Sequence, residues 1–202
     1  MLKIIPLLLG TVLAAQAQQV TLVNSSMKQF SGSDGVTFRY PAIWNFSTEN
    51  EFYSPSSITA PYRSPQAVVF FKDAGEFNPY PETTLNGAEF VYAQDKAATA
   101  EICPALTPRG DANAHSLEPT TINGIKYKHV QLESAGMCHQ IREDVYATYR
   151  NQTCYLFDLA IHTICSGVKD NTRDITPDEL SQVHASLEKI LSSIEISDLK
   201  KN

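Results

Sequence analysis

Two segments near the end of the chain alternate between apolar and polar residues with the period of a β-strand. Residues 137–149 and 153–163 are both rich in strand-forming side chains, such as Val145, Tyr155 and Phe157. Asn tolerates the left-handed backbone that a two-residue hairpin loop requires. The pattern therefore predicts a long β-hairpin that turns at Asn151 and Gln152, with Arg150 facing Thr153.

This register decides which hairpin side chains share a face. It places Cys138 opposite Cys165, and it places Cys154 on the other face of the second arm. Along that arm one face is strongly apolar and the other is mixed, which predicts that the two sides of the sheet are covered unequally. The apolar face holds Tyr155, Phe157, Leu159 and Ile161, and the mixed face holds Leu156, Asp158, Ala160 and His162.

Further strands are predicted upstream of the hairpin. Residues 35–40 alternate, residues 45–47 resume an extended chain, and residues 67–71 form a continuous apolar run typical of a central strand. Residues 125–133 form a strand that leads into the hairpin and makes a three-stranded meander. A short edge strand is predicted at Ile194 and Ile196.

Two helices are expected. Asn86 and Glu89 fit a capping box, and apolar residues at helical spacing follow it up to Ile102. Thr176, followed by Pro177 and by Glu179 three positions after the cap, predicts a second helix up to about residue 193. Its buried face should hold Leu180, Val183, Leu187, Ile190 and Leu191.

These elements occur in an order that resembles a known superfamily. A strand with Gly35, Phe38, Tyr40, Pro41 and Trp44, a mid-chain helix, a meander led by Gly124 and a C-terminal helix resemble the PsbP/Mog1-like superfamily. The resemblance implies an α+β fold, namely an α/β/α sandwich around a mainly antiparallel sheet with a C-terminal meander and helix. It implies no functional residue, because no motif of the superfamily's characterised members matches this chain.

The first residues indicate export. An apolar run over residues 4–13 is too short to span a bilayer, and Ala15-Gln16-Ala17 fits a signal-peptide cleavage site. We expect a signal peptide at residues 1–17, a single domain at 18–202 and no membrane span after cleavage. Loss of Lys3 makes the formal net charge of −6 one unit more negative, which argues against nucleic acid as a partner.

Four cysteines in an exported chain indicate two disulfides, with three possible connectivities. Their spacing does not match a zinc site. The hairpin register pairs Cys138 with Cys165 and leaves Cys154 for Cys103. The predicted mid-chain helix ends at Cys103, so this second bridge would join a helix to the sheet.

Candidate chemistry is sparse. The sequence has no Gly-x-Ser-x-Gly nucleophile motif and no glycine-rich phosphate loop. Glu143, Asp144 and Asp158 lie on the hairpin, where a solvated strand face explains them better than acid–base catalysis. His139 and His162 are diagonal neighbours on one face and are the candidate metal ligands, although two separate imidazoles explain them better.

The sequence does not place any of the remaining histidines next to His139 and His162. His129 joins the face of His139 and His162 only if the first hairpin of the meander has a compatible register. His115 is expected in a loop and His184 on the helix, where neither has a reason to approach the others.

The sequence thus predicts an exported, secreted or periplasmic, disulfide-stabilised module that is not an enzyme. Its expected role is binding or assembly at the cell envelope or outside it, with an unknown protein or envelope component as partner and no cofactor. The alternative is a hydrolase or metal-dependent enzyme that uses the face of His139, His162 and Asp158.

Overall fold

The structure is a computed structural model of the chain, and it describes residues 26–49, 65–72, 77–103, 114–168 and 170–197. The predicted signal peptide and most of the loop around residues 50–66 lie outside the described residues. Within the described part there are eleven strands and one helix, as follows: β1 (Met27–Ser31), β2 (Val36–Pro41), β3 (Asn45–Ser47), β4 (Ala67–Lys72), β5 (Leu85–Asp95), β6 (Ala114–Ser116), β7 (Thr120–Ile122), β8 (Ile125–Gly136), β9 (His139–Arg150), β10 (Thr153–Ile164), α1 (Pro177–Ser192) and β11 (Glu195–Ile196).

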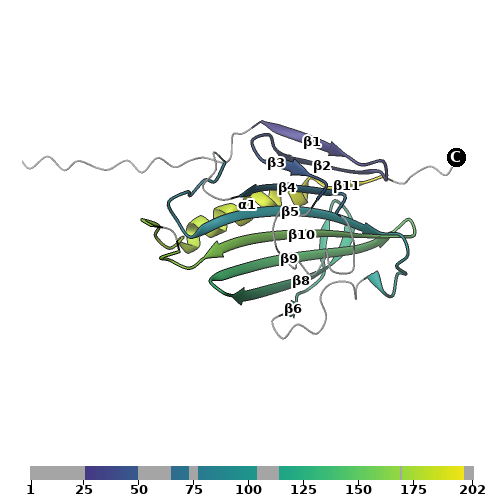
Figure 1. Ribbon diagram of the computed structural model, residues 1–202. Coiled ribbons are helices and arrows are strands. Elements are labelled where there is room, and N and C mark those ends of the chain that lie inside the picture. Colours follow the sequence, from purple (N-terminus) through teal and green to yellow (C-terminus); the bar gives the residue numbers. More distant parts are fainter. Residues whose placement is uncertain (1–25, 50–64, 73–76, 104–113, 169, 198–202) are drawn as a thin grey trace, which may run out of the picture.

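The strands form two antiparallel sheets. The large sheet has the order β3-β4-β5-β10-β9-β8-β6, with β7 also paired to β8, and the small sheet has the order β1-β2-β11. Helix α1 lies behind β4 and β5 in the view of Figure 1 and packs on one face of the large sheet. The small sheet joins the same core through Phe38, whose ring packs at an interplanar angle of 60° against Phe90 of β5 with ring centroids 5.1 Å apart.

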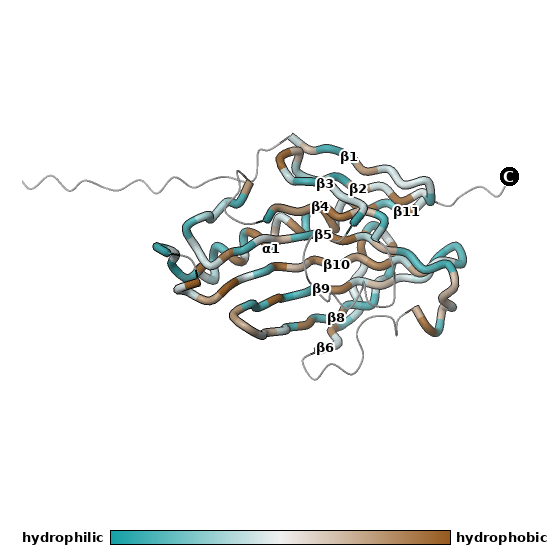
Figure 2. The backbone as a smooth tube through the Cα atoms, viewed as in Figure 1, coloured by the Kyte–Doolittle hydropathy of each residue, from teal (hydrophilic) through white to brown (hydrophobic). Residues whose placement is uncertain are grey.

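The hairpin of β9 and β10 has the predicted register. Arg150 pairs with Thr153, and the pairing continues without a shift to His139 and Ile164. Asn151 and Gln152 adopt φ values of 52° and 61°, which are the two left-handed residues of a type I′ turn. Figure 2 shows the hydrophobic colouring concentrated on β4, β5 and β10, the strands in the middle of the large sheet.

The C-terminal helix is confirmed with its cap. The side chain of Thr176 accepts a hydrogen bond from the Glu179 backbone, and the Glu179 carboxylate accepts one from the Thr176 backbone. Arg173 forms an ion pair with the same carboxylate at 2.6 Å. The hydrogen bonds from Arg173 lower the pKa of Glu179 to about 2. Val183, Leu187, Ile190 and Leu191 form the buried face of the helix.

The predicted mid-chain helix is wrong. Residues 86–95 belong to β5, which pairs with both β4 and β10. A strand that is buried on both faces loses the alternation by which strands are recognised. Its apolar residues then coincide with helical spacing, and Phe90, Val91 and Tyr92 supply the strand preference that decides the outcome.

The broad class is confirmed as α+β with a mainly antiparallel sheet. The described part contains one helix, on one face of the large sheet, so it does not contain the second helical layer of an α/β/α sandwich. The meander of β8, β9 and β10 and the terminal strand β11 are present as predicted.

Candidate functional site

The face of the large sheet that points away from α1 carries four buried ionisable side chains, which we call the acidic cluster: Glu89, Glu143, Asp158 and His162. In the strand register Ala160 lies between Glu89 and Glu143, with Asp158 and His162 two residues to either side. Glu89 and Asp158 are 0% exposed, Glu143 is 4% and His162 is 6%. The four side chains therefore surround one small residue at the centre of the sheet.

The polar contacts of the acidic cluster are unequal. His162 Nε2 lies 3.2 Å from Glu89 Oε1. Neither carboxyl oxygen of Asp158 accepts a hydrogen bond from an N–H or hydroxyl group in the part of the chain that the structure describes. Burial, followed by the charges of Glu143, Glu89 and Asp144, raises the pKa of Asp158 well above its ordinary value. This environment therefore favours the protonated form of Asp158.

The predicted register is right for these residues, but their predicted environment is wrong. Asp158 faces Val145 and has Glu143 as a diagonal neighbour, as expected. The face is not solvated, because the same side of the sheet also buries apolar residues, among them Val91 and Leu156. A strand pattern shows which side chains share a face but not what covers that face.

The two candidate metal ligands are in different environments. His139 is exposed at the end of β9, whereas His162 is buried beside Glu89. Among the residues that the structure describes, no three His, Cys, Asp or Glu side chains are arranged to hold a metal ion. His129 lies on the opposite face of the sheet from His162, because it pairs with Tyr146.

A second ionisable group, the histidine–aspartate cluster of His129, Asp144 and His184, lies where α1 packs on the sheet. The two oxygens of Asp144 are occupied separately, with His129 Nε2 at 2.6 Å and His184 Nε2 at 2.9 Å. The ring of His129 also stacks on Tyr146 with centroids 4.2 Å apart. One carboxylate therefore joins β8, β9 and α1.

The carboxyl pKa is shifted in opposite directions in the two clusters: it is lowered at Asp144 and raised at Asp158. Burial of Asp144 favours its neutral form, but the hydrogen bonds with His129 and His184 outweigh it and hold the pKa of Asp144 well below its ordinary value. The hydrogen bond to Asp144 raises the pKa of His184. A depression of about 350 Å³ next to these residues is lined by Arg142, Asp144 and His184 among others. The cluster is thus a partly accessible ion pair between the helix and the sheet.

The sequence did not reveal the histidine–aspartate cluster. His184 was expected to have no reason to approach other histidines, and this is wrong. The feature of the sequence that could have revealed this cluster is the turn between β8 and β9. A two-residue turn at Met137 and Cys138 fixes the register that brings His129 next to Asp144. Met-Cys is not a typical pair for such a turn, so nothing in the sequence drew attention to it.

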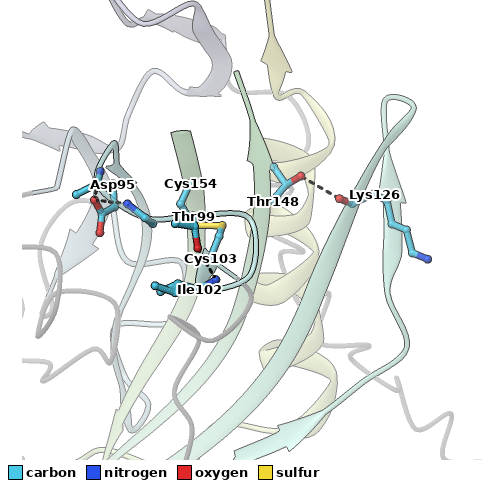
Figure 3. The surroundings of a disulfide bond; sticks show 9 residues. Asp95, Thr99, Ile102, Cys103, Lys126, Thr148 and Cys154 are labelled. Atoms are coloured by element: carbon cyan, nitrogen blue, oxygen red, sulfur yellow. Dashed lines mark hydrogen bonds between the residues drawn. A yellow bond between two sulfur atoms is a disulfide. The ribbon is translucent and has the colours of Figure 1, made fainter. Parts of the chain in front are cut away.

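One disulfide is present among the described residues, and it joins Cys103 to Cys154 with a Cα–Cα distance of 5.4 Å. Figure 3 shows that Cys103 comes from a short turn after β5, not from a helix end as expected. The Asp95 carboxylate accepts a hydrogen bond from the backbone of Ala97 at 2.7 Å and so holds the start of this turn. Both sulfurs are buried, since Cys103 and Cys154 are 0% exposed.

The other two cysteines do not form the predicted bridge in this structure. Cys138 and Cys165 are free and exposed. They are neighbours nevertheless, because the Cys165 backbone N–H donates to the Cys138 carbonyl at 3.1 Å. The predicted register therefore holds at this end of the hairpin, while the predicted bond is not made there.

Comparison with known proteins gives likeness in structure only. No protein-family model matches the chain, and no curated protein matches it. Among solved structures, the Ran-binding protein Mog1p of Saccharomyces cerevisiae is 9% identical, with a TM-score of 0.46 over 87% of this chain and 97% of Mog1p. LpqN of Mycobacterium tuberculosis, involved in cell envelope biogenesis, is 10% identical, with a TM-score of 0.46 over 85% and 92%. A protein of unknown function from Pseudomonas aeruginosa is 12% identical, with a TM-score of 0.38 over 86% and 99%.

Mog1p shares its name with the superfamily that the sequence resembles. At these TM-scores the likenesses carry no argument about function or partner. The candidate sites therefore rest on the residues of this chain alone.

Proposed function

We propose that the protein is an exported, disulfide-stabilised module with a binding or assembly role at the cell envelope or outside it. The observation that carries the proposal is the buried bridge between Cys103 and Cys154. Disulfides of this kind form and persist in oxidising compartments and are rare in the cytosol. The apolar run and the Ala15-Gln16-Ala17 signal at the start of the sequence support the same location.

The proposal includes the organisation of the chain. Residues 1–17 are a signal peptide that is removed, and residues 18–202 form one domain of the PsbP/Mog1-like type. In the described part of the chain no helix is long and apolar enough to cross a membrane. The two ionisable clusters lie in packed positions of the fold, which suits a structural or binding role better than turnover of a substrate.

Expression with the native leader, followed by fractionation and intact-mass measurement, tests this proposal. The exported form should begin at Gln18 and should contain the linked peptides of Cys103 and Cys154 under non-reducing conditions. A cytosolic product that keeps Met1 and has Cys103 reduced would contradict it. Cross-linking in the native envelope fraction then identifies the partner.

The alternative, an enzyme that uses the face of His139, His162 and Asp158, is favoured by one observation. A carboxyl group whose pKa is raised by burial and by neighbouring carboxylates has the properties of a general acid. A hydrolase substrate panel tests it. Turnover that is lost in Asp158→Asn but kept in Glu118→Gln would favour the enzyme over the binding module.

Zinc titration tests the metal-dependent form of the alternative. Stoichiometric zinc binding by the wild type that is absent in His139→Ala would support a metal centre. His162→Ala is a poor test of it, because His162 is buried against Glu89 and its removal leaves that carboxylate without the imidazole.

A further inference from the structure

The open end of the β9–β10 hairpin holds two free thiols next to each other. His139 and Ile164 form the last pair of the ladder, and Cys138 and Cys165 are the next residues on each side. The backbone hydrogen bond from Cys165 to Cys138 extends the pairing by one position. Cysteines that face each other across neighbouring strands are close enough to bridge.

The backbone at Cys138 is unusual for cysteine. Met137 and Cys138 have φ values of 47° and 65° and form the two-residue turn between β8 and β9. Turns of this type strongly prefer Asn and Gly, because other side chains are strained in the left-handed conformation. Strained residues at exposed positions are frequently associated with function. Here the strain holds a thiol at the solvent-exposed end of the hairpin.

We propose that Cys138 and Cys165 form a thiol–disulfide exchange site whose substrates are disulfides outside the fold. Cys138 and Cys165 are exposed to solvent, whereas Cys103 and Cys154 are fully buried. Exposed and strained pairs are the reducible ones, and buried pairs resist reduction. One chain therefore carries a permanent bridge and a reversible one.

Access to the site is open. The two cysteines line a depression of about 480 Å³ together with Gly136, His139 and Thr163 among others. Met137 beside it is 97% exposed. A small disulfide such as oxidised glutathione can therefore reach either sulfur without a change in the fold.

The two thiols have different roles in the exchange. The hydrogen bond with Cys138 raises the pKa of Cys165, with further contributions from burial and from the charges of Cys138 and Asp174. The thiolate is the attacking species, so a raised pKa makes Cys165 the weaker candidate for the first attack. Cys138 is thus the nucleophile and Cys165 the resolving thiol.

The reaction is balanced as follows. The Cys138 thiolate attacks one sulfur of oxidised glutathione, breaks its S–S bond and releases one glutathione thiolate, which takes up a proton. Cys165 then loses its proton and attacks the Cys138 sulfur of the mixed disulfide. This step forms the Cys138–Cys165 bond and releases the second glutathione. The protein dithiol is oxidised by two electrons, and the glutathione disulfide is reduced to two thiols.

Equilibration of the purified chain in glutathione buffers of graded redox ratio tests the proposal. The samples are quenched with acid, alkylated and mapped by peptide mass. Cys138 and Cys165 should titrate together as one two-electron step while Cys103 and Cys154 stay linked. The equilibrium constants for the two bridges should differ by about a thousandfold or more, in keeping with the usual gap between labile and structural disulfides.

Three outcomes would overturn the proposal. The first is a Cys138–Cys165 bond that resists reduction as strongly as the buried one, which would make it a second structural bridge. The second is a pair that stays reduced in every buffer. The third is oxidation that links Cys138 or Cys165 only to a second chain.

Single variants assign the two roles. In Cys165→Ser the Cys138 thiol should accumulate a mixed disulfide with glutathione, since no resolving thiol remains. In Cys138→Ser the same adduct should form on Cys165 more slowly than it forms on Cys138 in Cys165→Ser, because burial and the charge of Asp174 still disfavour the Cys165 thiolate. Equal rates in the two variants would contradict the assignment. Both positions are exposed, so the circular dichroism of both variants should match the wild type, and the test is independent of export.

Discussion

Replacement of Asp158 by Asn should stabilise the protein, and the gain should grow as the pH rises. Asp158 is fully buried, and Val91 and Val145 are its partners across the sheet. Burial first, and then the charges of Glu143, Glu89 and Asp144, raise its pKa above the ordinary value of 3.8. Asn has nearly the same shape and carries no charge, so it removes the cost of ionisation while its N–H₂ group can donate to Glu143.

The sign follows from proton linkage. An acid whose pKa is higher in the folded state than in the unfolded state binds more protons when folded. The free energy of unfolding therefore falls as the pH rises above 3.8, by up to about 1.4 kcal/mol per pH unit for one group. This contribution stops growing only when the pH passes the folded-state pKa. Between pH 4 and pH 6 the wild type should thus lose up to about 3 kcal/mol that the Asn variant keeps.

Urea unfolding at pH 4, 5, 6, 7 and 8, measured by circular dichroism for both proteins, gives the difference in unfolding free energy at each pH. Near pH 4 the two should agree within about 1 kcal/mol, because the protonated acid and the amide are alike. At pH 7 the variant should be clearly more stable. The exposed variant Glu118→Gln is the matched control and should follow the wild type at every pH.

A second variant tests the repulsion between Asp158 and Glu143. Glu143→Gln should also stabilise at neutral pH, and the double variant should gain less than the sum of the two single variants, because each change relieves the same repulsion. A pH-independent difference, or an Asn variant that is less stable than the wild type at pH 8, would refute the reasoning. It would mean that Asp158 is ionised in the fold and is held by a donor outside the described residues.

Three further outcomes are expected from the same unfolding assay. Asp144→Asn should cost about 2 kcal/mol near pH 5. The lowered pKa of Asp144 makes this contribution present above pH 3.8, and the raised pKa of His184 makes it decline as the pH rises above 6.5. A cost that is the same at pH 5 and pH 8 would contradict this reasoning. Cys103→Ser with Cys154→Ser opens a loop with a sequence separation of 51 residues and should cost about 4 kcal/mol in the chain-entropy model, whereas a loss below about 1 kcal/mol would show that the bridge is not structural. Thr176→Ala should cost about 1 kcal/mol through the lost helix cap, and Thr176→Ser should restore most of it.

The sequence predicts the hairpin of β9 and β10 well because local chemistry determines it. Asn151 and Gln152 adopt the left-handed turn that their position indicates, and one turn then sets every pair from Arg150 to His139. The helix cap at Thr176 is equally local. In both cases the residues that decide the structure are neighbours in the chain.

The failures have the opposite character. β5 is a strand because β4 and β10 pair with it on either side, and β10 comes from much later in the chain. Asp158 is buried by what covers the sheet, which a strand pattern does not contain. His184 meets Asp144 only because α1 packs on the face of the large sheet to which Asp144 points. Long-range packing decides each of these features, and single-sequence patterns do not record it.

The two ionisable clusters are separated by a single strand thickness, and this constrains what either can do. Glu143 and Asp144 are consecutive on β9 and point to opposite faces, one toward Asp158 and the other toward His129 and His184. The charge of Asp144 contributes to the raised pKa of Asp158, so the charge state on the helix side affects the pKa of a carboxyl group on the other face. An ordinary core would place apolar residues at such positions, because buried carboxyl groups that are not fully hydrogen-bonded destabilise a fold. Sequences break local rules of this kind mainly at functional sites. If the acidic cluster serves the binding role proposed above, Asp158→Asn should weaken binding while it stabilises the fold, and a stabilised variant that binds as well as the wild type would separate the cluster from that role.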